Sequence, residues 1–268
     1  MKKIILGLGI FAVSLALIPM FAAFEAHVIN VTAKIENALS VPTDPITFGT
    51  VFPQEHLNKP LRVALSQSFI DENRVDDVEY FIRQKPKCGI TTNNGTVLVG
   101  PTATGHVSLD AVDKLVIDCG PAPRELVTDN RDTPTVDETE TWGVLPSLCP
   151  YISKDGSDED GLVTQNDESL KSFHQPFTIN GHQIVWNDTH GRLTKAGQDT
   201  VDNWIIDLAV PCFGGFCAQD WADFVHQISG SQDTDPNLYT QPIANEHKVF
   251  GCDLWVEVSG VSTSTRLL

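Results

Sequence analysis

The chain has 268 residues, of which 35 are Asp or Glu and 18 are Lys or Arg, so its formal net charge is −17. Such an acidic surface repels the phosphate backbone, and we therefore expect no nucleic-acid partner. Hydrophobic residues make up 41% of the chain. The length allows one large β domain or two small ones.

The first 22 residues have the layout of a secretory signal peptide. A short positive region precedes an uncharged, mostly apolar run over residues 4–24. The small residues Ala22 and Ala23 predict cleavage between them. The alternative is an uncleaved membrane anchor, because about 20 apolar residues span a bilayer and Met20 stands where the peptidase prefers a small residue. In both cases we expect residues 23–268 to be secreted or at the cell surface, with membrane contact only through a retained signal segment.

Four β-strands are predicted in the first 85 residues. In the segment 27–36 apolar and polar residues alternate, a period of two that is typical of a half-buried strand. Further strands are expected at 46–52, at 61–69 and at 78–83. Strands at this spacing, separated by turns, are typical of an antiparallel sandwich or barrel. The apolar positions expected to face the core include Ile29, Val31, Ala33, Ile35, Leu61, Val63, Leu65, Phe69, Val78, Tyr80 and Ile82.

The middle of the chain, over residues 86–200, is rich in Gly, Pro, Thr, Asn and Asp and has only short apolar pieces. Two stretches, 129–141 and 154–161, are acidic and poor in apolar residues. We interpret this region as long loops and short strands inserted into the sandwich and partly held by cysteines. A loop region of this length is otherwise hard to order.

Strong strand signals return at the end of the chain. Apolar and polar residues alternate over 203–210 and again over 250–258. Trp255 falls on the polar face of its strand, and we interpret it as packed under a loop or, alternatively, as part of a partner-facing patch. Between these strands, apolar residues at helical spacing over 218–228 predict a short helix with Asp220 as its N-cap.

Early and late strands around a loop-rich middle predict an all-β fold. We expect a single antiparallel, jelly-roll-like β-sandwich over residues 23–268, with a loop-rich insertion around 86–200 and one short helix. The two ends of the chain are expected to close this sandwich together.

Six cysteines follow the export signal, and an even number in an oxidising compartment predicts disulfide bonds. Six thiols allow 15 connectivities, among which the sequence does not choose. None of the spacings is C-x-x-C, which argues against a zinc site or a redox pair. The disulfide candidates are Cys88, Cys119, Cys149, Cys212, Cys217 and Cys252.

No catalytic residue, cofactor site or metal site is predicted. The sequence has no HExxH motif, no G-x-S-x-G elbow, no P-loop and no dinucleotide fingerprint. His182 and His190 flank a short apolar piece and could meet across a hairpin, but solvated loop histidines are the simpler interpretation. Asp158 and Asp160 fit part of a calcium loop, yet Gly156 stands where an acid is required, so we expect an exposed loop there.

Several segments resemble the TasA/camelysin family of secreted bacterial proteins and its uncharacterised exported relatives. The junction FAAFEAHVINVTAKIENAL, over residues 21–39, runs from an apolar signal through Ala-Ala-Phe into a strand. The segments ITFGTVFPQE (46–55), PCFGGFCAQD (211–220) and FGCDLWVEV (250–258) are also similar to segments of these proteins.

The resemblance implies a jelly-roll sandwich, a cut between Ala22 and Ala23, and a role in extracellular fibres or the biofilm matrix. Camelysins are also classed as metallopeptidases, but no residue of a zinc site maps onto this sequence, and that activity is not carried over. The long cysteine-bearing middle departs from the family pattern.

The sequence therefore predicts an exported protein that is not an enzyme and needs no cofactor. The first hypothesis is a structural or cell-surface protein of a matrix or fibre, with itself or other surface proteins as partners through β-edge contacts. The second is an extracellular ligand- or glycan-binding module using loops in 86–200. The third is a secreted hydrolase, for which no site can be named.

Overall fold

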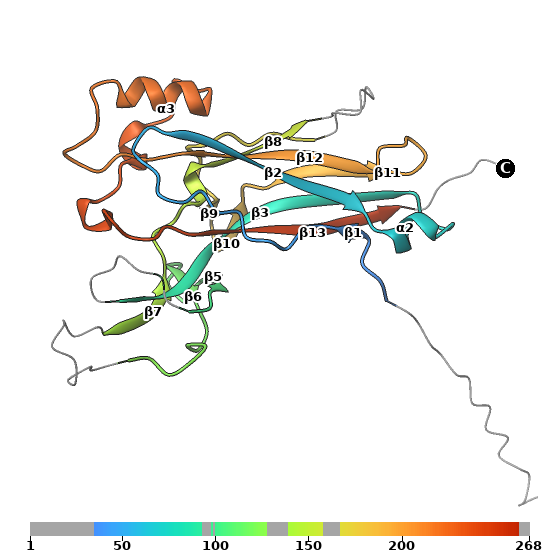
Figure 1. The fold of residues 1–268 in the computed structure, drawn as a ribbon, viewed down its shortest axis with the longest axis horizontal. Helices are drawn as coiled ribbons and strands as arrows, with labels where there is room; N and C mark the ends of the chain where they lie inside the picture. Colours follow the sequence, from blue (N-terminus) through green and yellow to red (C-terminus); the bar gives the residue numbers. More distant parts are fainter. Residues whose placement is uncertain (1–34, 93–97, 99, 128–138, 158–166, 263–268) are drawn as a thin grey trace, which may run out of the picture. The chain divides into compact units, whose positions relative to one another are not determined.

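The computed structural model describes residues 35–92, 98, 100–127, 139–157 and 167–262 (Figure 1). The predicted cleavage site at Ala22 and Ala23 lies outside these residues, as does most of the predicted strand 27–36. Two residues of that strand, Ile35 and Glu36, are described and neither is in a strand. Ile35 is 93% exposed, so its expected place on a buried face is wrong.

The first main sheet has four strands in the order β1-β2-β12-β8. Its two long central strands are β2 (His56–Leu65) and β12 (Val201–Ala209), which pair antiparallel along their whole lengths. The flanking strands are the short β1 (Leu39–Ser40) and β8 (Ile152–Ser157). The strands predicted at 61–69 and 203–210 are thus confirmed over 61–65 and 203–209, and the structure pairs them in one sheet.

The second main sheet is built on β3 (Asp77–Thr92), which extends well beyond the predicted strand 78–83. The first half of β3 pairs with β11 (Thr189–Thr194) and β13 (Cys252–Ser262). Its second half pairs with β4 (Ala103–Thr104) and β7 (Glu140–Val144). Two small hairpins complete the strands, β5 (His106–Leu109) with β6 (Leu115–Asp118) and β9 (Phe177–Asn180) with β10 (Gln183–Trp186).

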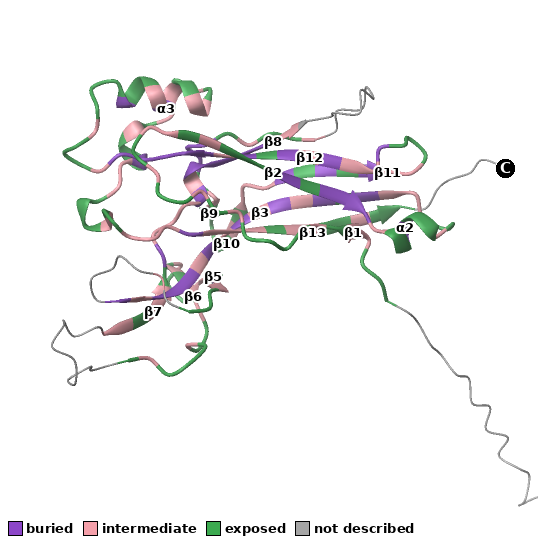
Figure 2. Cartoon of the chain, in the orientation of Figure 1, coloured by how far each residue is buried: buried purple, intermediate pink, exposed green. Residues whose placement is uncertain are grey.

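The core lies between the two main sheets, where the buried residues of β2, β3 and β12 gather (Figure 2). Side chains of a strand alternate between its two faces, so every second residue points into this layer. Burying one large aliphatic or aromatic side chain contributes about 1.5–3 kcal/mol. The buried residues include Leu61, Val63, Leu65, Val78, Tyr80, Ile82, Trp204, Ile206 and Leu208, which confirms the predicted faces and the all-β, sandwich-like fold.

Two of the early strand predictions are wrong in part. Residues 46–52 form no strand; Ile46 and Phe48 pack against the core without a backbone ladder, which shows that alternation alone does not supply a partner strand. The strand expected to reach Phe69 ends at Leu65. Phe69 lies instead in helix α2 (Gln67–Asp71), because Ser66 Oγ accepts a hydrogen bond from the Phe69 N–H (3.1 Å) and caps the helix.

The predicted late helix is present as α3 (Trp221–Ser229), so the described residues contain two helices rather than one. Asp220 occupies the N-cap position but makes no capping hydrogen bond; its carboxylate accepts one from Gln54 Nε2 (3.2 Å) instead. Short 3-10 turns are η2 (Cys149–Tyr151), η3 (Pro236–Tyr239) and η4 (Ile243–Asn245). No helix in the described part of the chain has the length and apolar character needed to cross a membrane.

The middle region contributes more to the sandwich than expected. The hairpins β5–β6 and β9–β10 are short strands, as predicted, but β4, β7, β8 and β11 belong to the main sheets. Residues 154–157, expected in an exposed loop, lie in β8, and Lys154 is 0% exposed. Asp158 and Asp160 of the same stretch lie outside the described residues.

The six cysteines form three pairs. Cys88 of β3 bonds to Cys119 after β6, and Cys149 of η2 bonds to Cys252 at the start of β13. The third pair, Cys212–Cys217, closes a small loop with a sequence separation of 5. The prediction that the thiols are paired is confirmed, and paired thiols indicate an oxidising, extracellular environment.

Candidate functional site

The edges of the two main sheets decide where another strand can add, because an unpaired edge presents free N–H and C=O groups. Four of the edge strands are β1, β8, β11 and β13, and the first three of these are short or covered. β1 has only two residues. β8 is covered by Leu170, which exchanges two backbone hydrogen bonds with Lys154 (2.7 and 2.9 Å), and β11 is met by Glu168, whose N–H donates to His190 O (2.9 Å).

The fourth edge belongs to β13, which pairs with β3 on one side only (Figure 1). Among the described residues, no backbone hydrogen bond joins the other side of residues 252–258 to a strand. The register shifts between Val258 and Gly260, and such a bulge interrupts regular pairing. The regular part of this edge is therefore 252–258, and we call it the β13 edge.

A groove with a volume of about 610 Å³ runs beside the β13 edge. Leu254 and Val256 of β13, together with Leu61 and Ile206 of the opposite sheet, make it apolar. Its outer wall is the segment 41–48. In the described residues the backbone of this segment makes no hydrogen bond to β13. Side-chain packing against the core holds the segment, so it can move away from β13 without breaking a backbone hydrogen bond to that strand.

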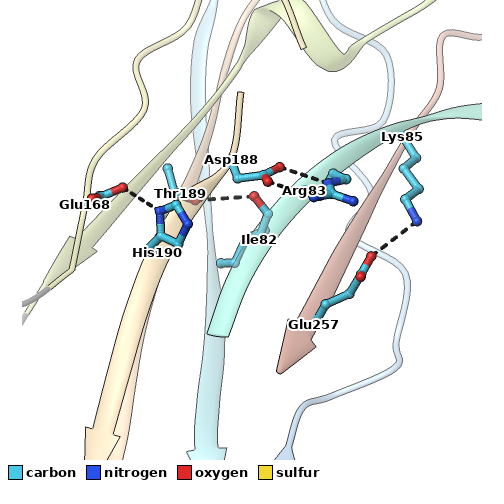
Figure 3. A network of polar contacts seen from close by, with 8 residues as sticks. All are labelled: Ile82, Arg83, Lys85, Glu168, Asp188, Thr189, His190 and Glu257. Carbon is cyan, nitrogen blue, oxygen red and sulfur yellow. Dashed lines mark hydrogen bonds and ion pairs between the residues drawn. The ribbon is translucent and has the colours of Figure 1, made fainter. Parts of the chain in front are cut away.

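The outer face of the second sheet carries a set of paired charges (Figure 3), and aromatic rings lie beside them. Arg83 of β3 makes two hydrogen bonds to Asp188 (3.0 and 2.9 Å), which raise the pKa of its guanidinium. The same guanidinium lies over the rings of Phe81 (4.6 Å to the centroid) and Trp186 (4.9 Å). Arg83 therefore covers a face of each ring and has its guanidinium bound to Asp188, so these ring faces are not open to a ligand.

Trp255 of β13 lies on this outer face, as its place in the strand predicts, and is 41% exposed. Lys85 Nζ lies 3.3 Å from the centroid of its ring and pairs with Glu257 (3.2 Å). The indole Nε1–H donates to Thr104 Oγ1 (3.2 Å), and the Thr104 hydroxyl donates to Asp253 (2.7 Å). The indole is therefore fixed in position while a large part of it faces solvent.

Lys154 and His174 are polar residues buried inside the sandwich. Lys154 Nζ has no hydrogen-bond partner within the described structure, and burial lowers its pKa to about 7, an effect that Asp188 partly offsets. His174 lies with Nε2 2.5 Å from Gln84 Oε1 and Nδ1 2.7 Å from Lys171 O. Burial and the charge of Lys154 lower the pKa of His174 to about 4, an effect that the Lys171 carbonyl partly offsets.

Ser153, His56 and Asp207 lie together without the geometry of a catalytic triad. His56 Nε2 and Ser153 Oγ contact the same oxygen of Asp207, whereas a catalytic triad requires the histidine between the serine and the carboxylate. His182 and His190 do not meet, because they pair separately with Asp113 (2.6 Å) and Glu168 (2.7 Å).

No group of three metal-ligating side chains occurs in the part of the chain that the structure describes. The candidate site is therefore the β13 edge with its groove and the adjoining outer face. The sequence pointed to Trp255 because this apolar residue falls on the polar face of its predicted strand. The position of that strand at the edge follows from the order of strands in the sheet and has no local sequence signal.

Comparison of the chain with protein-family models, with curated proteins and with solved structures found no match.

Proposed function

We propose that the protein is an exported structural component of a cell surface or extracellular matrix, whose copies associate by strand addition. In this association, residues 27–36 of one copy pair with the β13 edge of another. The observation that carries the proposal is the β13 edge itself, a regular strand edge without a backbone partner in the described structure, beside an apolar groove.

The sequence of 27–36 has the properties that this groove requires. Ile29, Val31 and Ile35 share one face, which matches the apolar walls formed by residues such as Leu254 and Val256. The segment 27–36 is longer than the β13 edge, 252–258, so one strand suffices to pair the edge. Main-chain hydrogen bonds supply affinity in such an addition, and alternate side chains supply specificity.

The predicted export and the acidic composition bear on the same proposed function. The signal-like segment and the three cysteine pairs are consistent with an oxidising exterior, and the resemblance to the TasA/camelysin family implies a matrix or fibre role. Loss of Lys2 and Lys3 with the signal changes the net charge from −17 to −19. Repulsion between copies should then weaken as carboxylates are protonated at low pH.

Electron microscopy of the chain from residue 23 onward, over a range of pH and concentration, tests the proposal. We expect filaments at low pH or high concentration and none from the chain that retains residues 1–22. Val31→Asp places a charge on the apolar face of the donor strand and should abolish filaments. Thr32→Asp adds the same charge to the opposite face and should retain them. A chain that stays monomeric in every condition, or equal behaviour of the two variants, would refute strand addition.

A further inference from the structure

We propose that the outer face of β13 around Trp255 binds a neutral carbohydrate chain. The site adjoins the groove of the proposed assembly, because Trp255, Thr104 and Asp253 also line that groove. It differs from assembly in using side chains rather than the backbone of the β13 edge. The site consists of Trp255, Thr104 and the two ion pairs Lys85–Glu257 and Lys87–Asp253.

Trp255 supplies a rigid, exposed apolar plane. Its Nε1–H is held by Thr104 and one face of its ring is covered by Lys85. Among the described residues, no other aromatic ring or cation contacts this indole. A pyranose ring presents C–H groups on its faces, which pack on an indole with little loss of side-chain entropy when that indole is already fixed.

The two ion pairs place hydrogen-bond donors and acceptors side by side at the edge of the indole. Lys87 Nζ lies 2.6 Å from Asp253, and Lys85 Nζ lies 3.2 Å from Glu257 (Figure 3 shows the second pair). A sugar hydroxyl both donates and accepts, so it can bond to a lysine and to a carboxylate at once, and hydrogen bonds to charged groups are the strong ones.

The charge of the patch selects among ligands. Two lysines and two carboxylates cancel, so the patch offers no net charge to an ionic ligand. The acidic protein as a whole also repels polyanions. A neutral glycan uses the donors and acceptors without requiring a net charge.

Trp186 does not offer the same surface, although it lies on the same side of the sheet. Its ring is covered by Arg83, which also lies over Phe81 and is bound to Asp188. Phe177 contacts the ring from another side, at 5.2 Å between centroids. Trp255 is therefore the ring that the structure assigns to ligand binding.

Isothermal titration of the exported full chain in dilute solution at neutral pH, with cellohexaose, maltohexaose and chitohexaose as probes, tests the proposal. We expect at least one of these neutral hexasaccharides to bind and to change tryptophan fluorescence, and alginate, a polyanion, not to bind. Trp255→Ala should weaken binding by about tenfold or more, whereas Trp255→Phe should retain part of it.

Controls separate this site from general apolar docking and from assembly. Phe216→Ala changes a residue that is 76% exposed in the loop closed by Cys212–Cys217 and should leave binding unchanged. Trp255→Leu keeps apolar bulk without a ring and should bind as weakly as Trp255→Ala. Val31→Asp should bind the glycan normally even where it blocks filaments. Absence of binding to all three hexasaccharides, or unaltered binding by Trp255→Ala or Trp255→Leu, would overturn the proposal.

Discussion

Replacing the buried Lys154 by methionine should stabilise the protein, and by an amount that depends on pH. The ammonium group is 0% exposed and has no hydrogen-bond partner within the described structure. Methionine fills a similar volume without a charge. Asp188 remains bound to Arg83 after the substitution.

The lowered pKa of Lys154 sets the size of the expected stabilisation. Its lowering from 10.5 to about 7 corresponds to a cost of roughly 5 kcal/mol for holding the charged form in the folded state, at about 1.36 kcal/mol per pKa unit. Between these two values the unfolded chain binds more protons than the folded one, so stability rises with pH over that window. Below pH 7 both states are protonated and the full cost remains.

We expect Lys154→Met to raise the free energy of unfolding by about 2–5 kcal/mol at pH 7, with the advantage over the wild type shrinking by roughly 2 kcal/mol at pH 9. Urea denaturation followed by tryptophan fluorescence, at pH 7, 8 and 9 with the disulfides intact, measures this difference. Lys171→Met is the matched control, because Lys171 is 54% exposed and its replacement should change stability by about 0.5 kcal/mol or less at every pH. A constant difference between Lys154→Met and the wild type would refute the reasoning.

Two further predictions concern stability. Replacing Cys149 and Cys252, with a sequence separation of 103, by serine should lower the free energy of unfolding by about 4–5 kcal/mol. Replacing Cys212 and Cys217 should lower it by about 2 kcal/mol, because the longer loop restricts the unfolded chain more. Chemical denaturation compares the two variants, and equal losses would contradict the loop argument. His174 has a folded pKa of about 4, below its ordinary 6.5, so the unfolded chain gains the proton first and stability should fall by roughly 3 kcal/mol from pH 6.5 to pH 4. His174→Gln should flatten that profile in the same assay, and an unchanged slope would show that other groups cause it.

The sequence predicts the core strands well because their apolar and polar residues alternate, and the strands that pair with them show the same alternation. Val63, Tyr80 and Ile206 all face the core as expected. The extension of β3 past Arg83 has no such signal, since Lys85 and Lys87 resemble loop residues until Glu257 and Asp253 of β13 pair with them.

The failures arise where tertiary contacts override local composition. The charged segment that begins at Lys154 resembles a loop, but β12 and Leu170 pair with it on both sides and make it a strand. Residues 46–52 have the alternation of a strand and no partner. The β13 edge could be predicted as a strand but not as an edge, because its exposure depends on which strands the chain places beside it.

The measurement that tests strand addition most directly is hydrogen–deuterium exchange of the compact unit 36–268 with a synthetic peptide of residues 23–35. If the peptide pairs with the β13 edge, the amides of 252–258 that point away from β3 should become protected, while those of the already paired β2 and β12 should not change. A peptide carrying Val31→Asp should give no protection. Unchanged exchange at 252–258 with excess wild-type peptide, or equal protection by both peptides, would contradict the proposed assembly.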